Sequence, residues 1–111
     1  MTRIEVRIDS LPIGRPVRLE NGQRGIVVVR RSATEIHAFQ DVCPHAGWRL
    51  SDGEIVDGLL ECPGHGMQFE LDTGRCVDVG SHCLEPVAVS RVGEYVSFAL
   101  HTEQQLKRGA A

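Results

Sequence analysis

The stretch that decides the fold is residues 41–76, DVCPHAGWRLSDGEIVDGLLECPGHGMQFELDTGRC. It holds two short motifs that each join a cysteine to a histidine: Cys43-Pro44-His45 and, sixteen residues later, Cys62-Pro63-Gly64-His65. Each motif offers one thiolate and one imidazole from a short loop, and both are common metal ligands. Two such loops can close on one inorganic centre, so the sequence predicts a metal centre in this stretch.

On both sides of this stretch the chain consists of short apolar runs separated by turn residues. Asn21-Gly22 is a strong hairpin signal because both residues tolerate positive φ, and Gly93-Glu94 is a second expected turn. No segment has a convincing helical period. The pattern predicts strands at Arg3–Ile8, Val17–Leu19, Gly25–Val29, Ile36–Phe39, Val87–Val92 and Tyr95–Leu100.

Residues 41–76 have a different texture, with many Gly, Pro, Cys and His residues and apolar runs only at 55–56, 59–60 and 68–71. This composition indicates a loop-rich insert with its own small sheet. We therefore predict an all-β fold in one domain, residues 1–111. Its base is an antiparallel β-sandwich from about 1–40 and 77–103, and the metal-binding subdomain at about 41–76 is inserted into it.

The composition fits a globular chain of one domain, with 111 residues, 41% hydrophobic and 24% charged. No apolar run is long enough to span a bilayer, and the opening MTRIEVRIDS lacks the apolar stretch of a secretory signal. We expect a cytoplasmic protein that does not bind membranes. Four cysteines in a reducing compartment favour metal or redox chemistry over disulfides.

Charge is uneven along the chain. Residues 41–76 have seven acidic and two basic side chains, a net charge of −5 against −3 for the whole chain. Such a lobe repels nucleic acid and favours docking on a basic patch of another protein. The acidic residues are Asp41, Asp52, Glu54, Asp57, Glu61, Glu70 and Asp72.

The two motifs resemble the Rieske family, whose pattern is C-x-H followed by C-x-x-H. Neighbouring residues resemble the family too, at Pro44, Gly47, Leu50-Ser51-Asp52-Gly53, Gly66, Phe69, Asp72-Thr73-Gly74 and Leu84-Glu85-Pro86-Val87. The resemblance implies the Rieske fold and one [2Fe–2S] cluster per chain. It implies that the sulfurs of Cys43 and Cys62 hold one iron, and that nitrogens of His45 and His65 hold the other.

Rieske proteins of respiratory complexes carry a disulfide between the two ligand loops, and serine and tyrosine hydroxyls that donate to the cluster. The matching positions here are Trp48, Gly64, Met67 and Phe69, none of which can supply those bonds. Hydroxyl donors stabilise the added electron, so we expect a potential toward the lower end of the roughly −150 to +300 mV range of Rieske centres. A low potential favours a donor to an oxygenase over a quinol oxidase.

A structural zinc site is the alternative for the same four side chains, because two cysteines and two histidines are a standard zinc set. Zinc sites more often pair cysteine with cysteine and histidine with histidine, whereas each motif here mixes the two. The colour of the purified protein separates the two hypotheses.

The resemblance implies a soluble one-electron carrier and not an enzyme: a monomeric Rieske-type ferredoxin of a multicomponent bacterial oxygenase. Its partners would be a flavoprotein reductase and a terminal oxygenase, either a dioxygenase or a toluene-monooxygenase-like diiron enzyme. A chain of 111 residues has no room for a second catalytic domain. The alternative is the small subunit of a nitrite reductase-like complex.

Several residues outside the motifs receive ordinary structural interpretations. Cys76 and Cys83 are expected to be buried thiols. Trp48 either shields the centre or forms part of a docking surface, and shielding is favoured because a lone tryptophan is more often packed. His37, His82 and His101 have no partner at ligand spacing and are expected to be surface or strand residues.

Overall fold

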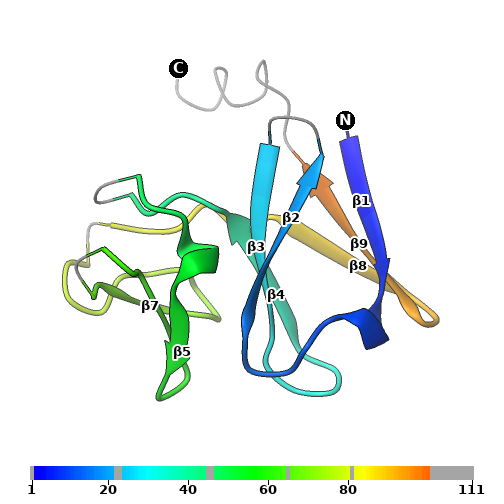
Figure 1. Ribbon diagram of the computed structural model, residues 1–111, viewed down its shortest axis with the longest axis horizontal. Coiled ribbons are helices and arrows are strands. Elements are labelled where there is room, and N and C mark those ends of the chain that lie inside the picture. Colours follow the sequence, from blue (N-terminus) through cyan, green and yellow to red (C-terminus); the bar gives the residue numbers. More distant parts are fainter. Residues whose placement is uncertain (1, 22–23, 45–46, 65, 81, 101–111) are drawn as a thin grey trace.

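The structure is a computed structural model that describes residues 2–21, 24–44, 47–64, 66–80 and 82–100. In these ranges the chain forms nine strands and two 3₁₀ turns, and no α-helix, which confirms the all-β prediction (Figure 1). None of the described segments is a helix that could cross a membrane. The elements are β1 Thr2–Arg7, η1 Ile8–Ser10, β2 Pro16–Asn21, β3 Arg24–Arg30, β4 Ile36–Gln40, η2 Leu50–Asp52, β5 Glu54–Val56, β6 Leu59–Glu61, β7 Gln68–Glu70, β8 Ala88–Val92 and β9 Tyr95–Leu100.

The strands form three antiparallel sheets of three strands each. The terminal sheet has the order β1-β9-β8, and the middle sheet has the order β2-β3-β4. These two pack together as the predicted sandwich, to which both ends of the described chain contribute. The small sheet, β5-β6-β7, comes from the predicted insert and lies on the other side of the middle sheet (Figure 1).

The middle strand β3 is buried on both faces. Ile26 and Val28 pack toward the terminal sheet, whereas Val27 and Val29 pack toward the small sheet, and all four have 0% exposed surface. A strand with one solvated face alternates apolar and polar residues, so the unbroken run IVVV is explained by burial on two sides. Two hydrophobic cores therefore meet at β3.

The chain leaves the base at the end of β4 and returns beside the same strand. Gln40 N–H donates to the carbonyl of Glu85 at 2.9 Å, and Val87 N–H donates to the carbonyl of Ala38 at 2.9 Å. Between these points Val77 and Leu84 both bond to the insert: Val77 N–H donates to the carbonyl of Gln68 at 2.9 Å, and Leu84 N–H donates to the carbonyl of Gly74 at 2.7 Å. Entry and exit of the insert thus lie side by side on the base.

The two predicted hairpins both form. The turn Gly93-Glu94 joins β8 to β9 as predicted, with Gly93 at φ +60°. In the β2–β3 hairpin the strands pair as far as Asn21 and Arg24. The connection is therefore residues 22–23, one position later than the predicted Asn21-Gly22, and it lies outside the described residues.

Because β3 is buried on both faces, we expect the same loss of stability when a valine is shortened on either face. Val27→Ala and Val28→Ala each remove buried methyl groups, and we expect each to lower the free energy of unfolding by about 2 kcal/mol. Val92→Ala is the matched control because Val92 is 76% exposed, and its effect should stay within about 0.5 kcal/mol. Chemical denaturation measures all three. A Val28→Ala protein as stable as Val92→Ala would contradict the two-core description.

Candidate metal centre

The first cysteine motif forms a tight turn that the backbone closes. Cys43 N–H donates to the carbonyl of Trp48 at 2.8 Å, and Gly47 N–H donates back to the carbonyl of Cys43 at 2.9 Å. Gly47 adopts φ +74°, a conformation that costs glycine little and other residues more. The sequence therefore places glycine where the turn reverses.

The second motif repeats this turn with the same spacing. Cys62 N–H donates to the carbonyl of Met67 at 2.8 Å, and Gly66 N–H donates to the carbonyl of Cys62 at 3.1 Å. Gly66 adopts φ +72°. In their described residues the two loops therefore form equivalent backbone hydrogen bonds, and each turn begins at a cysteine.

Both cysteine side chains end in the same hydrophobic core. Cys43 is 1% exposed and Cys62 is 2% exposed, and both belong to the core that β3 shares with the small sheet. A thiol in such a place is closed to bulk solvent but available to a group held between the loops. His45 and His65 lie outside the described residues, so their part in the ligand set stays a prediction.

Trp48 connects the two loops by packing. Its indole lies so close to Gly64 that a Cβ there would come within 2.5 Å of the ring. Both are among the four positions that match the disulfide and the hydroxyl donors of respiratory Rieske proteins. Trp48 is nevertheless 50% exposed, so the favoured interpretation as a packed side chain is wrong, and the exposure agrees with the alternative of a docking surface.

One residue of the predicted acidic surface is not on the surface. The side chain of Asp41 is 0% exposed and forms an ion pair with Arg18 at 2.7 Å. Its hydrogen bond raises the pKa of the Arg18 guanidinium above the ordinary value. The sequence count could not separate this buried charge from the six acids that reach solvent.

The other two cysteines differ from each other. Cys76 is buried as predicted, and its Sγ accepts a hydrogen bond from Val79 N–H at 3.4 Å. Cys83 is exposed, so the prediction of a buried thiol is wrong there. Cys83 pairs with Arg75 in an isolated bridge at the rim of the small sheet, which leaves its side chain outside the core.

His37 is part of an ion-pair network that the sequence analysis missed. Its Nε2 lies 2.6 Å from Glu35 Oε2 and 3.8 Å from Asp72 Oδ1. The hydrogen bond with His37 lowers the pKa of Glu35. The three side chains could hold a metal ion, but Arg31 reaches both carboxylates, at 3.3 and 3.7 Å. The chain thus supplies its own cation here. Asp72 is remote in sequence, so no local pattern could have revealed the cluster.

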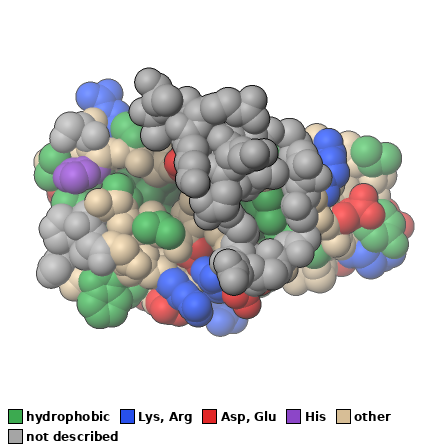
Figure 2. All heavy atoms as spheres, turned by 90° about the horizontal axis from the view of Figure 1, so that it is seen from above, with side chains coloured by type: hydrophobic (Ala, Val, Ile, Leu, Met, Phe, Trp, Pro, Cys, Tyr) green, Lys and Arg blue, Asp and Glu red, His purple; other side chains and the backbone are tan. Residues whose placement is uncertain are grey.

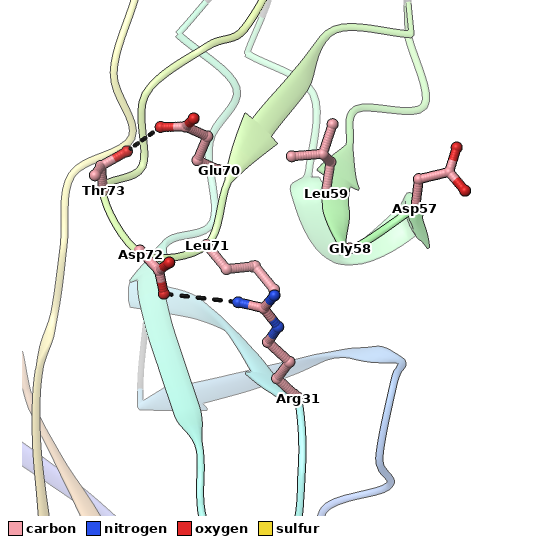
Figure 3. A pocket seen from close by; sticks show the side chains of 8 residues that line it. All are labelled: Arg31, Asp57, Gly58, Leu59, Glu70, Leu71, Asp72 and Thr73. Carbon is pink, nitrogen blue, oxygen red and sulfur yellow. Dashed lines mark hydrogen bonds and ion pairs between the residues drawn. The ribbon is translucent and has the colours of Figure 1, made fainter.

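A pocket of about 420 Å³ lies beside this network (Figure 3). Its carboxylates come from Asp57, Glu70 and Asp72, and Thr73 Oγ1 donates to Glu70 at 2.8 Å. Arg31 enters from the base and meets Asp72 (Figure 3). Neither of the described ligand candidates, Cys43 and Cys62, lines the pocket, so we assign it to the acidic surface.

A family model for the Rieske [2Fe-2S] domain matches residues 4–93. The chain belongs to this family. Membership implies a Rieske-type [2Fe–2S] cluster as its cofactor, as the sequence predicted. The described part of the site fits that group, because two buried thiols on matching turns enter one core.

Relatives and solved structures agree with this membership. The chain is 39% identical over 75 residues to the ferredoxin component of biphenyl 2,3-dioxygenase from Rhodococcus jostii, which covers 68% of each chain. It also superposes on the ferredoxin of carbazole 1,9a-dioxygenase from Nocardioides aromaticivorans, with a TM-score of 0.80 and 23% identity over 91% of this chain and 100% of that one. This second likeness shows the fold.

Other relatives in the family are much longer. Protein TIC 55 of Pisum sativum is 37% identical over 70 residues, which is 63% of this chain but 12% of that protein. The chain also spans 22% of the glycine betaine monooxygenase oxygenase subunit of Chromohalobacter salexigens. The Rieske domain therefore occurs both in small ferredoxins and inside larger proteins.

The matched turns predict matched effects of glycine substitution. In Gly47→Ala and Gly66→Ala the added Cβ meets no atom of the described residues within 4 Å, so we expect a cost from backbone strain, about 1 kcal/mol each. Both variants should lose iron to a chelator faster than the wild type, because the strain falls on the turns that position the cysteines.

Gly93→Ala is the control, since it carries the same kind of strain in a turn remote from the cysteines. It should lower stability by a similar amount and leave the rate of iron loss unchanged. Equal rates of iron loss in all three variants would contradict a role for the two turns in the metal centre.

Proposed function

We propose that this chain is a one-electron carrier that accepts an electron from a flavoprotein reductase and passes it to a terminal oxygenase. The observation that carries the proposal is the pair of equivalent turns, each presenting a buried cysteine to one shared core. The relative from Rhodococcus jostii, named as a ferredoxin component, supports the same role. The role needs no general acid, base or nucleophile, so the proposal is a carrier and not an enzyme.

In this proposal Cys43 and Cys62 bind one iron through their thiolates, and His45 and His65 bind the other through ring nitrogens. A Rieske cluster supplies reversible one-electron chemistry, and neutral imidazoles raise its potential because they donate less charge than thiolates. The buried cysteines anchor the site in the core. The zinc alternative has the same four ligands but offers no such chemistry.

The surface beside the ligand loops has the character of a docking site. Val42 is 55% exposed, and Val77 and Val79 are 47% and 39% exposed. Val77 lies next to the second loop, since its N–H donates to the carbonyl of Gln68 at 2.9 Å. Figure 2 shows hydrophobic side chains at the surface of this end of the molecule. In the proposal these exposed apolar groups contribute to the contact with the partner.

The acidic residues of the small sheet and its turns support the choice of partner, although Glu70 lies at the end of β7 away from the second ligand loop. Asp57, Glu70 and Asp72 line one pocket, and Glu54 and Glu61 line another of about 240 Å³. A negative surface raises the rate of encounter with a basic partner, and salt screens the effect. The proposal is therefore a transient complex with proteins that carry a basic patch.

The division of the chain belongs to the same proposal. Residues 41–76 would form the cluster-binding subdomain of a single Rieske domain, and residues 1–40 and 77–103 its base. The hydrogen bond from Leu84 N–H to the carbonyl of Gly74 ties this base segment to the subdomain just after the boundary.

A small subunit of a nitrite reductase is the second candidate. A chain described as such a subunit, from Mycobacterium tuberculosis, superposes with a TM-score of 0.76 at 20% identity over 92% of this chain. A permanent subunit and a carrier differ in their oligomeric state and in their response to salt.

One experiment tests the carrier. The purified holoprotein should elute as a monomer from gel filtration, take up one electron per chain in a reductive titration, and return fully to its oxidised spectrum. Its reduction by NADH and the flavoprotein reductase of a biphenyl dioxygenase system should slow as salt increases.

Variants locate the docking site in the same assay. Val79→Ser should reduce the second-order rate of reduction about five-fold, because it removes an apolar contact at the interface. Val92→Ser is the control, as Val92 is exposed on the β8–β9 hairpin of the base, and it should react like the wild type. A protein that takes up no electron, or that is isolated only in a fixed larger assembly, would contradict the proposal.

A further inference from the structure

Asp41 is a buried carboxylate two residues before the first cysteine of the metal centre. Its side chain is 0% exposed and accepts three hydrogen bonds. Burying a charge costs free energy unless the charge is paired and fully hydrogen-bonded, so the bonds of this carboxylate must offset its burial. The three bonds show what it holds together.

Two of the bonds close the neck of the first ligand loop. Ser51 N–H donates to Asp41 Oδ1 at 2.8 Å, and Ser51 Oγ donates to Oδ2 at 2.5 Å. Asp41 precedes the loop and Ser51 follows it, in the η2 turn. The carboxylate therefore spans the two ends of the segment that carries Cys43, His45 and Trp48.

The third bond fastens this neck to the base. Arg18, on β2, donates from Nη1 to Asp41 Oδ2 at 2.7 Å, and its side chain is only 20% exposed. Its guanidinium lies directly on Gly25, where a Cβ would collide with it. Asp41 N–H also donates to the carbonyl of Gly25 at 3.2 Å. Asp41 is therefore bonded to the β2–β3 hairpin twice, through its side chain to Arg18 and through its backbone N–H to Gly25.

The second ligand loop is closed in a different way: among the described residues no carboxylate joins its two ends, and Asp78 accepts a hydrogen bond only at one end, from Gln68 N–H at 3.2 Å. This loop is the tip of the β6–β7 hairpin, whose last backbone pair is Glu61 with Gln68. The strand ladder closes its neck, and Glu61 adds only a side-chain bond from Gln68 at 3.1 Å. No strand pair spans the first loop among the described residues. The Asp41 carboxylate takes the place of the missing ladder.

We propose that Asp41, held by Arg18 and Ser51, is the positioning residue of the first ligand loop. It fixes the loop against the base sheet and thereby sets how firmly and in what geometry Cys43 and His45 hold the cluster. The inference rests on the ligand set given under the proposed function and adds to it the device that aligns one half of that set. Asp41 itself does not contact the cluster in this account.

Two substitutions test the device. Asp41→Asn keeps the shape and removes the charge, whereas Ser51→Ala removes one hydroxyl, leaves every charge in place and is mild enough to fold. In both, the holoprotein should release iron to a chelator about ten-fold faster, as is typical when a residue that orients a metal ligand is lost. The g values of the reduced cluster should shift in both variants.

Glu20→Gln is the matched control. Glu20 binds the same guanidinium at 3.2 Å, but its side chain is 55% exposed and touches neither end of the loop. This variant should keep the wild-type g values and rate of iron loss. If Asp41→Asn and Ser51→Ala kept the wild-type g values and rate of iron loss, the proposal would be overturned. Asp41 would then be only a structural ion pair, even if both variants were less stable to heat.

Hydrogen exchange gives a readout that does not depend on iron. In Asp41→Asn and Ser51→Ala the amides of Cys43 and Gly47 should exchange faster, while those of Cys62 and Gly66 stay as in the wild type. Faster exchange in both loops alike, or in neither, would overturn the proposal. A wild-type protein purified without iron would instead refute the proposed function, and the exchange result would still decide the role of Asp41.

Discussion

The burial of β3 on both faces is the constraint on which the rest of the structure depends. Val28 packs into the sandwich and Val27 into the core of the small sheet, so one strand belongs to two hydrophobic cores. A subdomain attached through a shared core cannot move freely against its base, because protein interiors are close-packed. The loops that carry the cysteines are thereby built on a rigid support.

Rigidity at the base and accessibility at the tip are what electron transfer requires. A redox centre held by fixed turns needs little rearrangement when it gains an electron, and a partner must come close to it. Cys43 and Cys62 are closed off in the core, while Val42 and Trp48 are exposed beside them. The described residues of the two loops form matching backbone hydrogen bonds, but the loops are anchored by different means, one at the tip of a strand hairpin and the other through the Asp41 carboxylate.

Local patterns in the sequence predicted most of the architecture. The strands, the turn at Gly93-Glu94, the cysteine motifs and the family all follow from periodicity, turn chemistry and short spacings, which depend on neighbouring residues. The features that the sequence analysis missed depend on contacts between residues that are distant in the sequence. Arg18 and Asp41 are far apart in the sequence, as are His37 and Asp72, and nothing near either partner marks the pair.

Exposure was the other source of error. Cys83 and Trp48 are residue types that are usually buried, and both reach solvent here. Cys83 lies at the rim of the small sheet, and Trp48 rests on Gly64, whose lack of a side chain leaves room for the indole. Average preferences of residue types do not contain this information, because the tertiary position of each residue decides its exposure.

The central claim is that two cysteines and two histidines of this chain hold one [2Fe–2S] cluster. The most direct test is electron–nuclear double resonance on the reduced holoprotein, with histidine labelled by ¹⁵N. The account predicts strong couplings from two histidine nitrogens, lost one at a time in His45→Ala and His65→Ala. A reduced iron signal without coupled nitrogen, or a colourless protein that contains zinc in place of iron, would contradict it.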